Sequence, residues 1–478
     1  MTSWNWLRRM KCPPAMARRN PIARLAVEAL EVRQCPSTVS VYASGLLNPR
    51  GLTFGPDGLL YVAEGGSGGT LTTVGDPSVV QVPPPVGPYS GGFTSRISKI
   101  SAGGLRTTVA DGLPSSQTSA LLGNLVSGVS DVQFIGNTLY GIEAGAGVSH
   151  GLAGTDNTIF RVNTDGSTTT IADLSAFQKA NPVANPQPDD FEPDGTWYSM
   201  VAVRGALYAV EPNHGELDTI TPDGQISRVI DISASQGHVV PTAVAYHGNF
   251  YVGNLGTFPV TPGTENIYKI TPSGQITVAV SGLTTVVGVA FDHAGNMFVL
   301  ETDTTPGFPG PGALGSGKVV EVTDAGLVDI ATGLSIPTAM TFGPDGALYI
   351  SNLGFGAPPI GLGQILRVDL GTATDAVAGA AVTQAKTISP AATDQVDLAP
   401  VAGILAEAGA SSSWSGASGI EQPARKDTEA QPSPIGSAAA KGVSVGPVDG
   451  FFATKHRTAS PDGWTALDRD LPAPEILA

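Results

Sequence analysis

Charged residues are scarce in this chain of 478 residues, at 14%, against about 25% in typical globular domains. A helix-rich protein needs many Glu, Lys and Arg to keep its outer faces in water, so this scarcity argues against bundles and coiled coils. Gly (61 residues) and Pro (38) are plentiful, yet together they stay below the roughly 25–30% that marks low-complexity disorder. The composition therefore predicts short strands joined by many turns, with enough apolar residues for a core.

Long apolar runs are missing as well, and cysteine is nearly so. No stretch approaches the roughly 18 consecutive apolar residues of a membrane span, so we expect none. Cys12 and Cys35 both lie near the N-terminus, which leaves the rest of the chain with neither a disulfide nor a thiolate nucleophile. This distribution is compatible with an oxidising compartment.

The charge is unevenly distributed along the chain. Residues 1–36 carry a net charge of +5, residues 37–370 a net −16 and residues 371–478 a net −5. An acidic body repels nucleic-acid phosphates, which excludes DNA and RNA as expected partners. Cations and cationic ligands remain candidates.

Residues 1–37 form a basic leader that contains no apolar region of the kind found in secretory signals. The leader ends in Leu30-Glu31-Val32-Arg33-Gln34-Cys35-Pro36-Ser37. This ending resembles the arginine-rich leaders closing on L-E-x-R-x-x-P-[SA] that precede many large exported bacterial proteins. The resemblance implies a periplasmic, cell-surface or extracellular location. From the residues alone, a disordered basic tail remains the alternative.

Between about residues 38 and 370 the sequence repeats itself six times. Each repeat opens with a small-residue step and alternating apolar positions, as expected of a strand, followed by a Gly-containing turn such as 55–58 or 343–346. Three further strands follow, and four antiparallel strands per repeat describe a propeller blade. The six opening strands are 50–54, 130–134, 199–203, 242–246, 287–291 and 338–342.

The two ends of the repeat region complete one another. The sixth repeat stops after its third strand at Leu370, whereas residues 39–46 match the fourth strand at 278–283 and precede the first repeat. Pairing the ends would close the ring and leave no open sheet edge. We therefore predict an all-β, six-bladed propeller over 38–370, closed by its N-terminal strand. Residues 371–478, rich in Ala, Ser, Gly and Pro, are predicted to be a mostly disordered tail.

The blades resemble NHL-type repeats, and the propeller region is similar to the ScyD/ScyE family of bacterial propeller proteins. The motifs that carry this resemblance are Ala43-Ser44-Gly45-Leu46, Asn48-Pro49-Arg50-Gly51-Leu52-Thr53-Phe54-Gly55-Pro56-Asp57-Gly58, Tyr61-Val62-Ala63-Glu64 and their echo at 337–352. The resemblance implies a secreted or periplasmic propeller and transfers no catalytic residue.

Every repeat ends its second strand with an acid or its amide, and six-fold geometry would place these side chains in a ring near one mouth of the channel. Converging oxygen ligands suit a hard cation, above all Ca²⁺. The alternative is that each side chain accepts hydrogen bonds from backbone amides of the loop that follows it. The six residues are Glu64, Glu143, Glu211, Asn254, Glu301 and Asn352.

Three first-strand residues, Arg50, Thr242 and Thr338, are candidate ligand-binding groups on the same face. For Arg50 two interpretations stay open, which are an ion pair with Glu64 and the binding of an anionic substrate group. The longest loops also open on this face. One of them, 189–194, concentrates four acids and is either a Ca²⁺ loop or a solvated acidic segment.

Two functions are compatible with this pattern. The first is an exported scaffold or binding propeller that holds a protein, a polymer or a small molecule on its loop-bearing face. The second is a metal-dependent propeller enzyme, either a lactonase-like hydrolase or a quinoprotein-like dehydrogenase, with a channel cation. The sequence favours the first, because no general base is evident beside the predicted ring.

Overall fold

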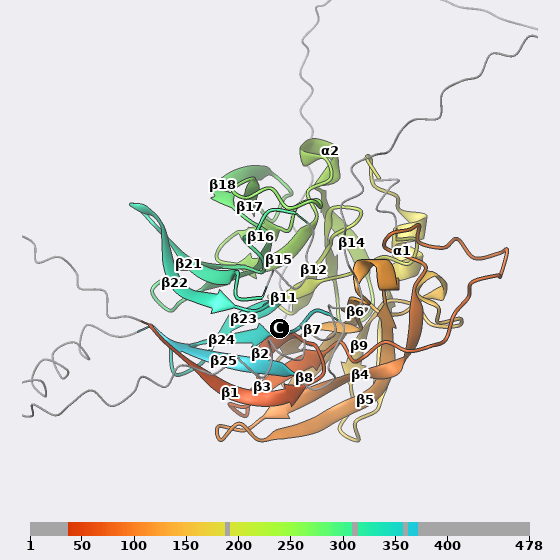
Figure 1. Cartoon of the computed structure of the whole chain (residues 1–478), viewed down its shortest axis with the longest axis horizontal. Coiled ribbons are helices and arrows are strands. Elements are labelled where there is room, and N and C mark those ends of the chain that lie inside the picture. The colour runs from red at the N-terminus through yellow and green to blue at the C-terminus, as the bar shows by residue number, and fades with distance from the viewer. Residues whose placement is uncertain (1–36, 187–191, 308–313, 357–361, 371–478) are drawn as a thin grey trace, which may run out of the picture. The chain divides into compact units, whose positions relative to one another are not determined.

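The computed structural model describes residues 37–186, 192–307, 314–356 and 362–370. Within them the chain forms six antiparallel sheets whose innermost strands contact one another in a closed ring, which is a six-bladed β-propeller (Figure 1). The predicted fold is thereby confirmed. The predicted tail at 371–478 and all of the predicted leader except Ser37 lie outside the described residues.

The first three blades each run from the channel outward. Blade 1 comprises β2 (Pro49–Phe54), β3 (Leu60–Glu64), β4 (Ser90–Ile100) and β5 (Arg106–Gln117), with the short β6 (Val126–Ser127) at its edge. Blade 2 comprises β7 (Val129–Ile135), β8 (Thr138–Glu143), β9 (Thr158–Val162) and β10 (Thr168–Asp173). Blade 3 comprises β11 (Ser199–Val203), β12 (Ala206–Glu211), β13 (Glu216–Ile220) and β14 (Ile226–Asp231).

The last three blades repeat the same order. Blade 4 comprises β15 (Pro241–Tyr246), β16 (Phe250–Asn254), β17 (Glu265–Ile270) and β18 (Ile276–Leu283). Blade 5 comprises β19 (Val286–Phe291), β20 (Met297–Glu301), β21 (Gly317–Thr323) and β22 (Gly326–Leu334). Blade 6 comprises β23 (Ala339–Phe342), β24 (Leu348–Asn352), β25 (Gly363–Asp369) and, from the other end of the chain, β1 (Thr38–Leu46).

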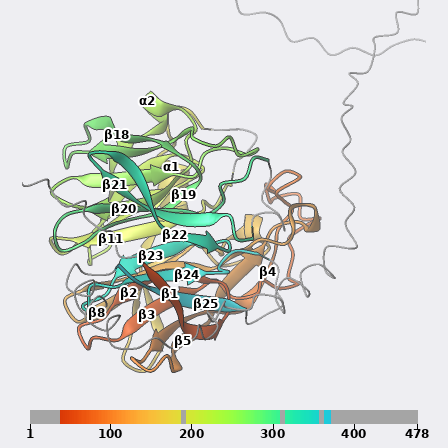
Figure 2. The same ribbon diagram turned by 60° about the vertical axis from the view of Figure 1, so that its left-hand side comes forward.

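The closure joins the two ends of the propeller in one sheet. β1 pairs antiparallel with β25, from Thr38 opposite Asp369 to Leu46 opposite Gly363, and the two strands lie side by side in Figure 2. Leu46 is fully buried against Leu52 and Ile365. Because fully burying a Leu side chain stabilises a fold by about 1.5–3 kcal/mol, the closing strand contributes apolar contacts as well as ladder hydrogen bonds.

Helices are short among the described residues. They are α1 (Leu174–Ala180), α2 (Ser233–Gln236) and the 3₁₀ turns η1 (Ala120–Leu122) and η2 (Val148–His150). No described helix combines the length and the apolar character needed to cross a membrane.

The core lies between the blades, with one buried apolar cluster at each of the six seams. An aromatic side chain near the end of an innermost strand packs against a second-strand ring of the preceding blade. Phe54 contacts Tyr349 with ring centroids 5.0 Å apart, and Phe134 contacts Tyr61 at the same distance. The sequence repeat therefore appears in the structure as a repeated contact between blades.

Candidate functional site

The two faces of the propeller differ in their connections. The loop-bearing face is the one on which β3 and its counterparts end, and it carries the long connections such as 65–89 and 144–157. The turn face is the one on which the innermost strands end, and its connections are short. The residues predicted to form a ring all end second strands, so they belong to the loop-bearing face.

All six ring residues are buried, and each accepts a hydrogen bond from a backbone amide. In four blades this amide belongs to the segment that leads into the innermost strand of the same blade. The oxygens of Glu64, Glu211, Glu301 and Asn352 accept from the amides of Leu47, Thr196, Thr284 and Ser335, respectively. A carboxylate or amide oxygen at this position ties the second strand to the incoming chain, because buried amides need an acceptor.

The other two ring residues bind amides elsewhere. Glu143 accepts from the amides of Ala144 and Gly145, at 3.2 and 2.9 Å, and burial raises its pKa to about 8. Asn254 accepts from the amide of Asn266 at 2.8 Å and donates to Glu265. Backbone amides thus bind the ring residue in every blade, but only Glu143 and Glu211 accept from the loop that follows, as the sequence alternative expected. The other donors belong to the segment before the innermost strand or, for Asn254, to β17, because those segments lie against the end of the second strand.

Basic side chains also bind some of the ring acids. Arg96 lies 2.7 Å from Glu64, Lys318 lies 3.5 Å from Glu301, and His214 lies 3.3 Å from Glu211. Across the described ranges, no three or more His, Cys, Asp or Glu side chains are grouped so that they could hold a metal ion. The channel cation therefore stays a prediction from the sequence.

Arg50 lies at the start of β2, is only 5% exposed and does not pair with Glu64. Its guanidinium donates to the carbonyl of Val126, in the chain leading to blade 2, and its central carbon lies 4.4 Å from the ring centroid of Phe355 and 5.9 Å from that of Tyr198. Burial lowers the pKa of Arg50, against the effect of Tyr198. The interpretation as a Glu64 ion pair was wrong, because Arg96 occupies that carboxylate from the facing strand.

Thr242 and Thr338 connect neighbouring blades. The hydroxyl of Thr242 donates to the carbonyl of Val286 at 2.5 Å, and that of Thr338 donates to the carbonyl of Pro49 at 2.7 Å. Both side chains are buried. Tyr198 of blade 3 also donates to the carbonyl of Thr338 across the ring of blades, at 3.1 Å. Of the three candidate ligand-binding residues, Arg50 and Thr338 are thus linked through Tyr198, and Thr242 lies apart in blade 4.

Sequence reasoning missed a buried polar cluster that joins the loops of blades 1 to 3. The hydroxyl of Tyr89 donates to Glu192 at 2.6 Å, and the Tyr89 ring packs on His150 at 4.5 Å. His150 lies 3.3 Å from Glu192 on one side and 2.8 Å from the hydroxyl of Ser116 on the other. Ser116, His150 and Glu192 are all at most 4% exposed, so this serine, histidine and carboxylate bind loops together and offer no open side to a substrate.

The acidic segment 189–194 is described only from Glu192 onward, so its predicted Ca²⁺ loop lies partly outside the described residues. Its described acids point into the protein. Asp194 accepts from the amide and hydroxyl of Ser149, at 2.7 and 2.6 Å, and from Lys179 at 2.5 Å. These two acids anchor loops, which the local sequence does not reveal because their partners lie up to 103 residues away.

A second group that the sequence did not reveal lies within blade 3. Glu216 and Asp218 of β13 are completely buried, and burial raises their pKa values to about 8 and about 7, respectively. Arg228 binds Glu216, whereas neither carboxylate oxygen of Asp218 has a hydrogen-bond partner. Alternation along β13 places both acids on one side of the strand, where apolar residues are usual.

Comparisons with known proteins give no family for this chain. No protein-family model and no curated protein matches the chain. A putative oxidoreductase (glucose dehydrogenase) from Thermus thermophilus is 16% identical, with a TM-score of 0.44 over 70% of this chain and 100% of that one. Virginiamycin B lyase from Staphylococcus aureus is 14% identical, with a TM-score of 0.37 over 70% and 99%. A gluconolactonase from Xanthomonas campestris is 11% identical, with a TM-score of 0.40 over 70% and 90%.

Proposed function

We propose that this chain is an exported, non-catalytic binding propeller similar to the ScyD/ScyE family, which holds a partner on the loop-bearing face of blade 1. The observation that carries the proposal is a surface that we name the blade 1 platform. It consists of residues 65–94 and 118–125, which are ordered by buried contacts and expose apolar side chains. A partner with an uncharged, partly apolar surface, such as a cell-surface polymer or a protein, fits it.

Contacts to two other parts of the protein, and one contact between its own two segments, hold the platform in place. The hydroxyl of Thr73 donates to the carbonyl of Val148 in blade 2, at 2.7 Å. Tyr89 reaches Glu192, and the amide of Ser119 donates to the carbonyl of Val86 at 2.8 Å, which joins the two segments of the platform. A surface that is already ordered loses little conformational entropy on binding, which favours affinity.

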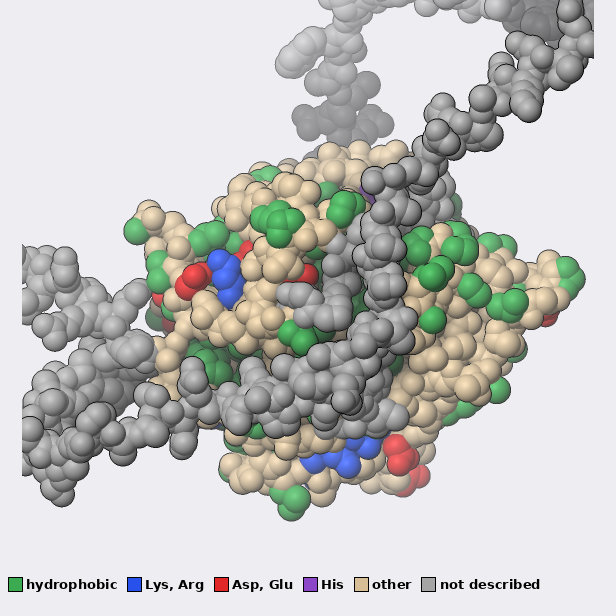
Figure 3. Space-filling view, viewed as in Figure 1, with side chains coloured by type: hydrophobic (Ala, Val, Ile, Leu, Met, Phe, Trp, Pro, Cys, Tyr) green, Lys and Arg blue, Asp and Glu red, His purple; other side chains and the backbone are tan. Residues whose placement is uncertain are grey.

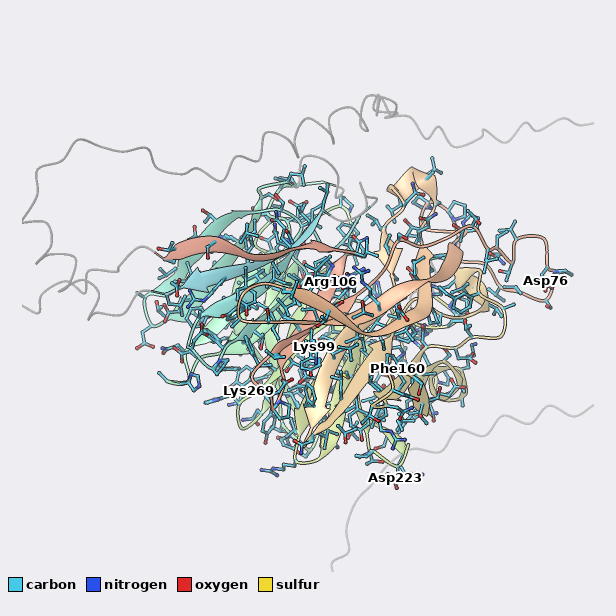
Figure 4. The ribbon with its side chains drawn as sticks, turned by 90° about the horizontal axis from the view of Figure 1, so that it is seen from below. Asp76, Lys99, Arg106, Phe160, Asp223 and Lys269 are labelled. Atoms are coloured by element: carbon cyan, nitrogen blue, oxygen red, sulfur yellow. The ribbon has the colours of Figure 1, made fainter. Side chains whose placement is uncertain are left out.

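The exposed part of the platform is apolar and nearly free of charge. Asp76 is its only charged residue and lies at the tip of the loop that projects from the blades (Figure 4). Hydrophobic side chains gather on the right of Figure 3, over the loops of blades 1 and 2. Exposed apolar groups on one surface mark binding sites more often than scattered ones do. The exposed platform residues are Leu71, Val74, Val80, Phe93 and Leu121, between 51% and 67% exposed.

Export is supported by the leader sequence and by the placement of both cysteines within it. To test it, the full chain is expressed in a bacterial host, and the protein in cytosol, periplasm and medium is quantified against a chain lacking residues 2–36. We expect the full chain outside the cytosol. Equal cytosolic retention of both chains would contradict export.

Binding is tested by co-sedimentation of the purified protein with isolated bacterial envelopes. The variant Val74→Asp, Val80→Asp, Leu121→Asp places three charges on the platform, and we expect it to lower the bound fraction at least about tenfold. The matched control is Leu105→Asp, Leu327→Asp, because both residues are exposed near the turn face, Leu105 in the connection between β4 and β5 and Leu327 at the start of β22. Equal binding by wild type and both variants would show that the platform does not bind this partner class.

No second function is proposed. The acids that would hold a channel cation in a propeller enzyme accept backbone hydrogen bonds, and no described observation favours catalysis over binding.

A further inference from the structure

We propose that the turn face carries a second binding site, a cavity beneath blades 5, 6 and 1 that takes a small organic cation. The cavity has a volume of about 260 Å³ and is lined by Phe54, Phe291, Asp292, His293, Phe342, Gly343 and Pro344. It lies on the face opposite the blade 1 platform and does not depend on the function proposed for that surface.

The cavity results from a difference among the six turns that join innermost and second strands. In blades 1, 5 and 6 these turns contain a four-residue segment closed by one hydrogen bond, from the amides of Gly58, Gly295 and Gly346 to the residue three positions earlier, at 2.9–3.1 Å. In blades 2 and 3 only two residues separate the strands, 136–137 and 204–205. The longer turns of these three adjacent blades border the pocket beside the aromatic residues at the strand ends.

Aromatic rings form much of this wall, and contacts with neighbouring blades hold them in place. Phe54 packs edge-on against Tyr349 at 5.0 Å, and Phe342 packs against Phe298 at 5.2 Å. Phe291 has His247 stacked on it at 4.8 Å. All three phenylalanines are half-buried, so part of each ring is free for a ligand. A cation near the face of an aromatic ring is attracted by its quadrupole.

The charge around the cavity is complementary to a cation. Asp292 is the acid in the lining, and the lining residues include no Lys or Arg. The carboxylate of Asp292 accepts from the amides of Ala294 and Asn296, both at 2.8 Å, which holds it at the cavity wall. Asp345, in the same turn as Pro344, is already bound by Arg367. His293 is the other titratable lining residue, and it is exposed.

Aromatic walls with one carboxylate suit a quaternary or tertiary ammonium group better than a neutral apolar molecule, because the cation gains both the ring quadrupoles and the carboxylate. An anion would face Asp292 and the negative ring faces. The described body is also strongly acidic, so small cations are concentrated near its surface. The lining residues come from strand ends and turns of three different blades. The sequence of any single repeat therefore did not reveal the site.

The experiment compares choline with 3,3-dimethylbutan-1-ol, a neutral molecule of the same shape, by saturation-transfer NMR and calorimetry on the full chain. We expect saturation of the choline N-methyl protons from protein aromatic protons, and binding at least about tenfold tighter for choline than for the alcohol. Equal affinity for both probes, or no binding of choline at millimolar concentration, would overturn the proposal.

Three variants in the lining and one control variant locate the site. Phe291→Ala and Phe342→Ala should each weaken choline binding about tenfold or more, whereas Phe134→Ala, which changes the same repeat position in blade 2, should leave it unchanged. Asp292→Asn removes the charge and keeps the Oδ1 acceptor for the turn amides, although it loses the oxygen that accepts from the Asn296 side chain. It should weaken choline binding without changing binding of the alcohol. Equal losses in all three phenylalanine variants would mean that choline binds elsewhere, and would overturn the proposal.

Discussion

The two faces of this propeller are built from the same strands and yet depend on different interactions. On the turn face, connections are short and are stabilised by contacts within a few residues, as in the hydrogen bond from Tyr61 to Asp57. On the loop-bearing face, each connection is unique and is held by buried polar contacts with other blades, as between Tyr89 and Glu192. Function can vary on the second face without disturbing the repeats.

The largest expected difference between the faces comes from a tryptophan side chain that is buried under the loops. Trp197, which precedes β11, is fully buried in the seam between blades 2 and 3. Trp197→Ala should lower the free energy of unfolding by about 3–5 kcal/mol, through lost burial and a new cavity. Phe342→Ala, at a half-buried turn-face position, should cost about 1–2 kcal/mol. Urea denaturation measures both, and equal losses would contradict the comparison.

The second largest difference between the faces is expected in how the free energy of unfolding depends on pH. Burial raises the pKa of Asp218 to about 7, above its unfolded value, so its contribution to stability is full at low pH and is lost as pH rises through about 7. We expect stability to fall between pH 5 and pH 8 as the neighbouring buried acids Glu216 and Asp218 lose protons, and Asp218→Asn to reduce the fall, as measured by thermal unfolding.

The turn-face control for this titration is Asp345. Burial raises its pKa, but hydrogen bonds from Arg367 and Tyr349 outweigh that and lower it. Its contribution to stability is therefore present above the unfolded pKa and is lost only as pH falls below it. Asp345→Asn should leave the slope between pH 5 and pH 8 unchanged. If stability depended less on pH in Asp345→Asn than in Asp218→Asn, the assignment of the pH dependence to Asp218 would be wrong.

A smaller effect is expected from the contact that anchors the blade 1 platform. Tyr89→Phe removes the hydroxyl that donates to buried Glu192, which should cost about 1–2 kcal/mol and speed proteolytic cleavage within 72–88. Limited proteolysis with mass spectrometry measures the rate. Tyr61→Phe removes an exposed turn-face hydrogen bond and should leave cleavage unchanged. Equal rates in all three proteins would mean that this contact does not order the platform.

The smallest effect is expected from a turn-face ion pair. Asp345 and Arg367 lie 3.0 Å apart, and their side chains are 40% and 29% exposed. Asp345→Asn should lower stability by less than about 1 kcal/mol at pH 7, because solvent screens exposed pairs. A loss larger than that of Tyr89→Phe would reverse the proposed order of the two faces.

The repeat pattern was sufficient to predict six blades, their four-stranded order and the closure by β1, because alternation and turn chemistry are local properties. The position of the ring residues at the ends of second strands was also predicted from the sequence. Their bonding was left open, since it depends on whether an amide of a distant segment or a channel ligand faces the oxygen. Arg50 illustrates the limit, because its partners Val126, Tyr198 and Phe355 come from three other parts of the chain.

The sequence by itself thus determined the blades and the turn face, whose geometry arises within each repeat. Only the tertiary structure decided how the loops order one another, which acids become buried in blade 3 and which turns come together around the open pocket of the turn face. The physical reason is that these features come from contacts between segments that are remote in sequence, 103 residues apart for Tyr89 and Glu192. Such contacts have no period that a repeat could display.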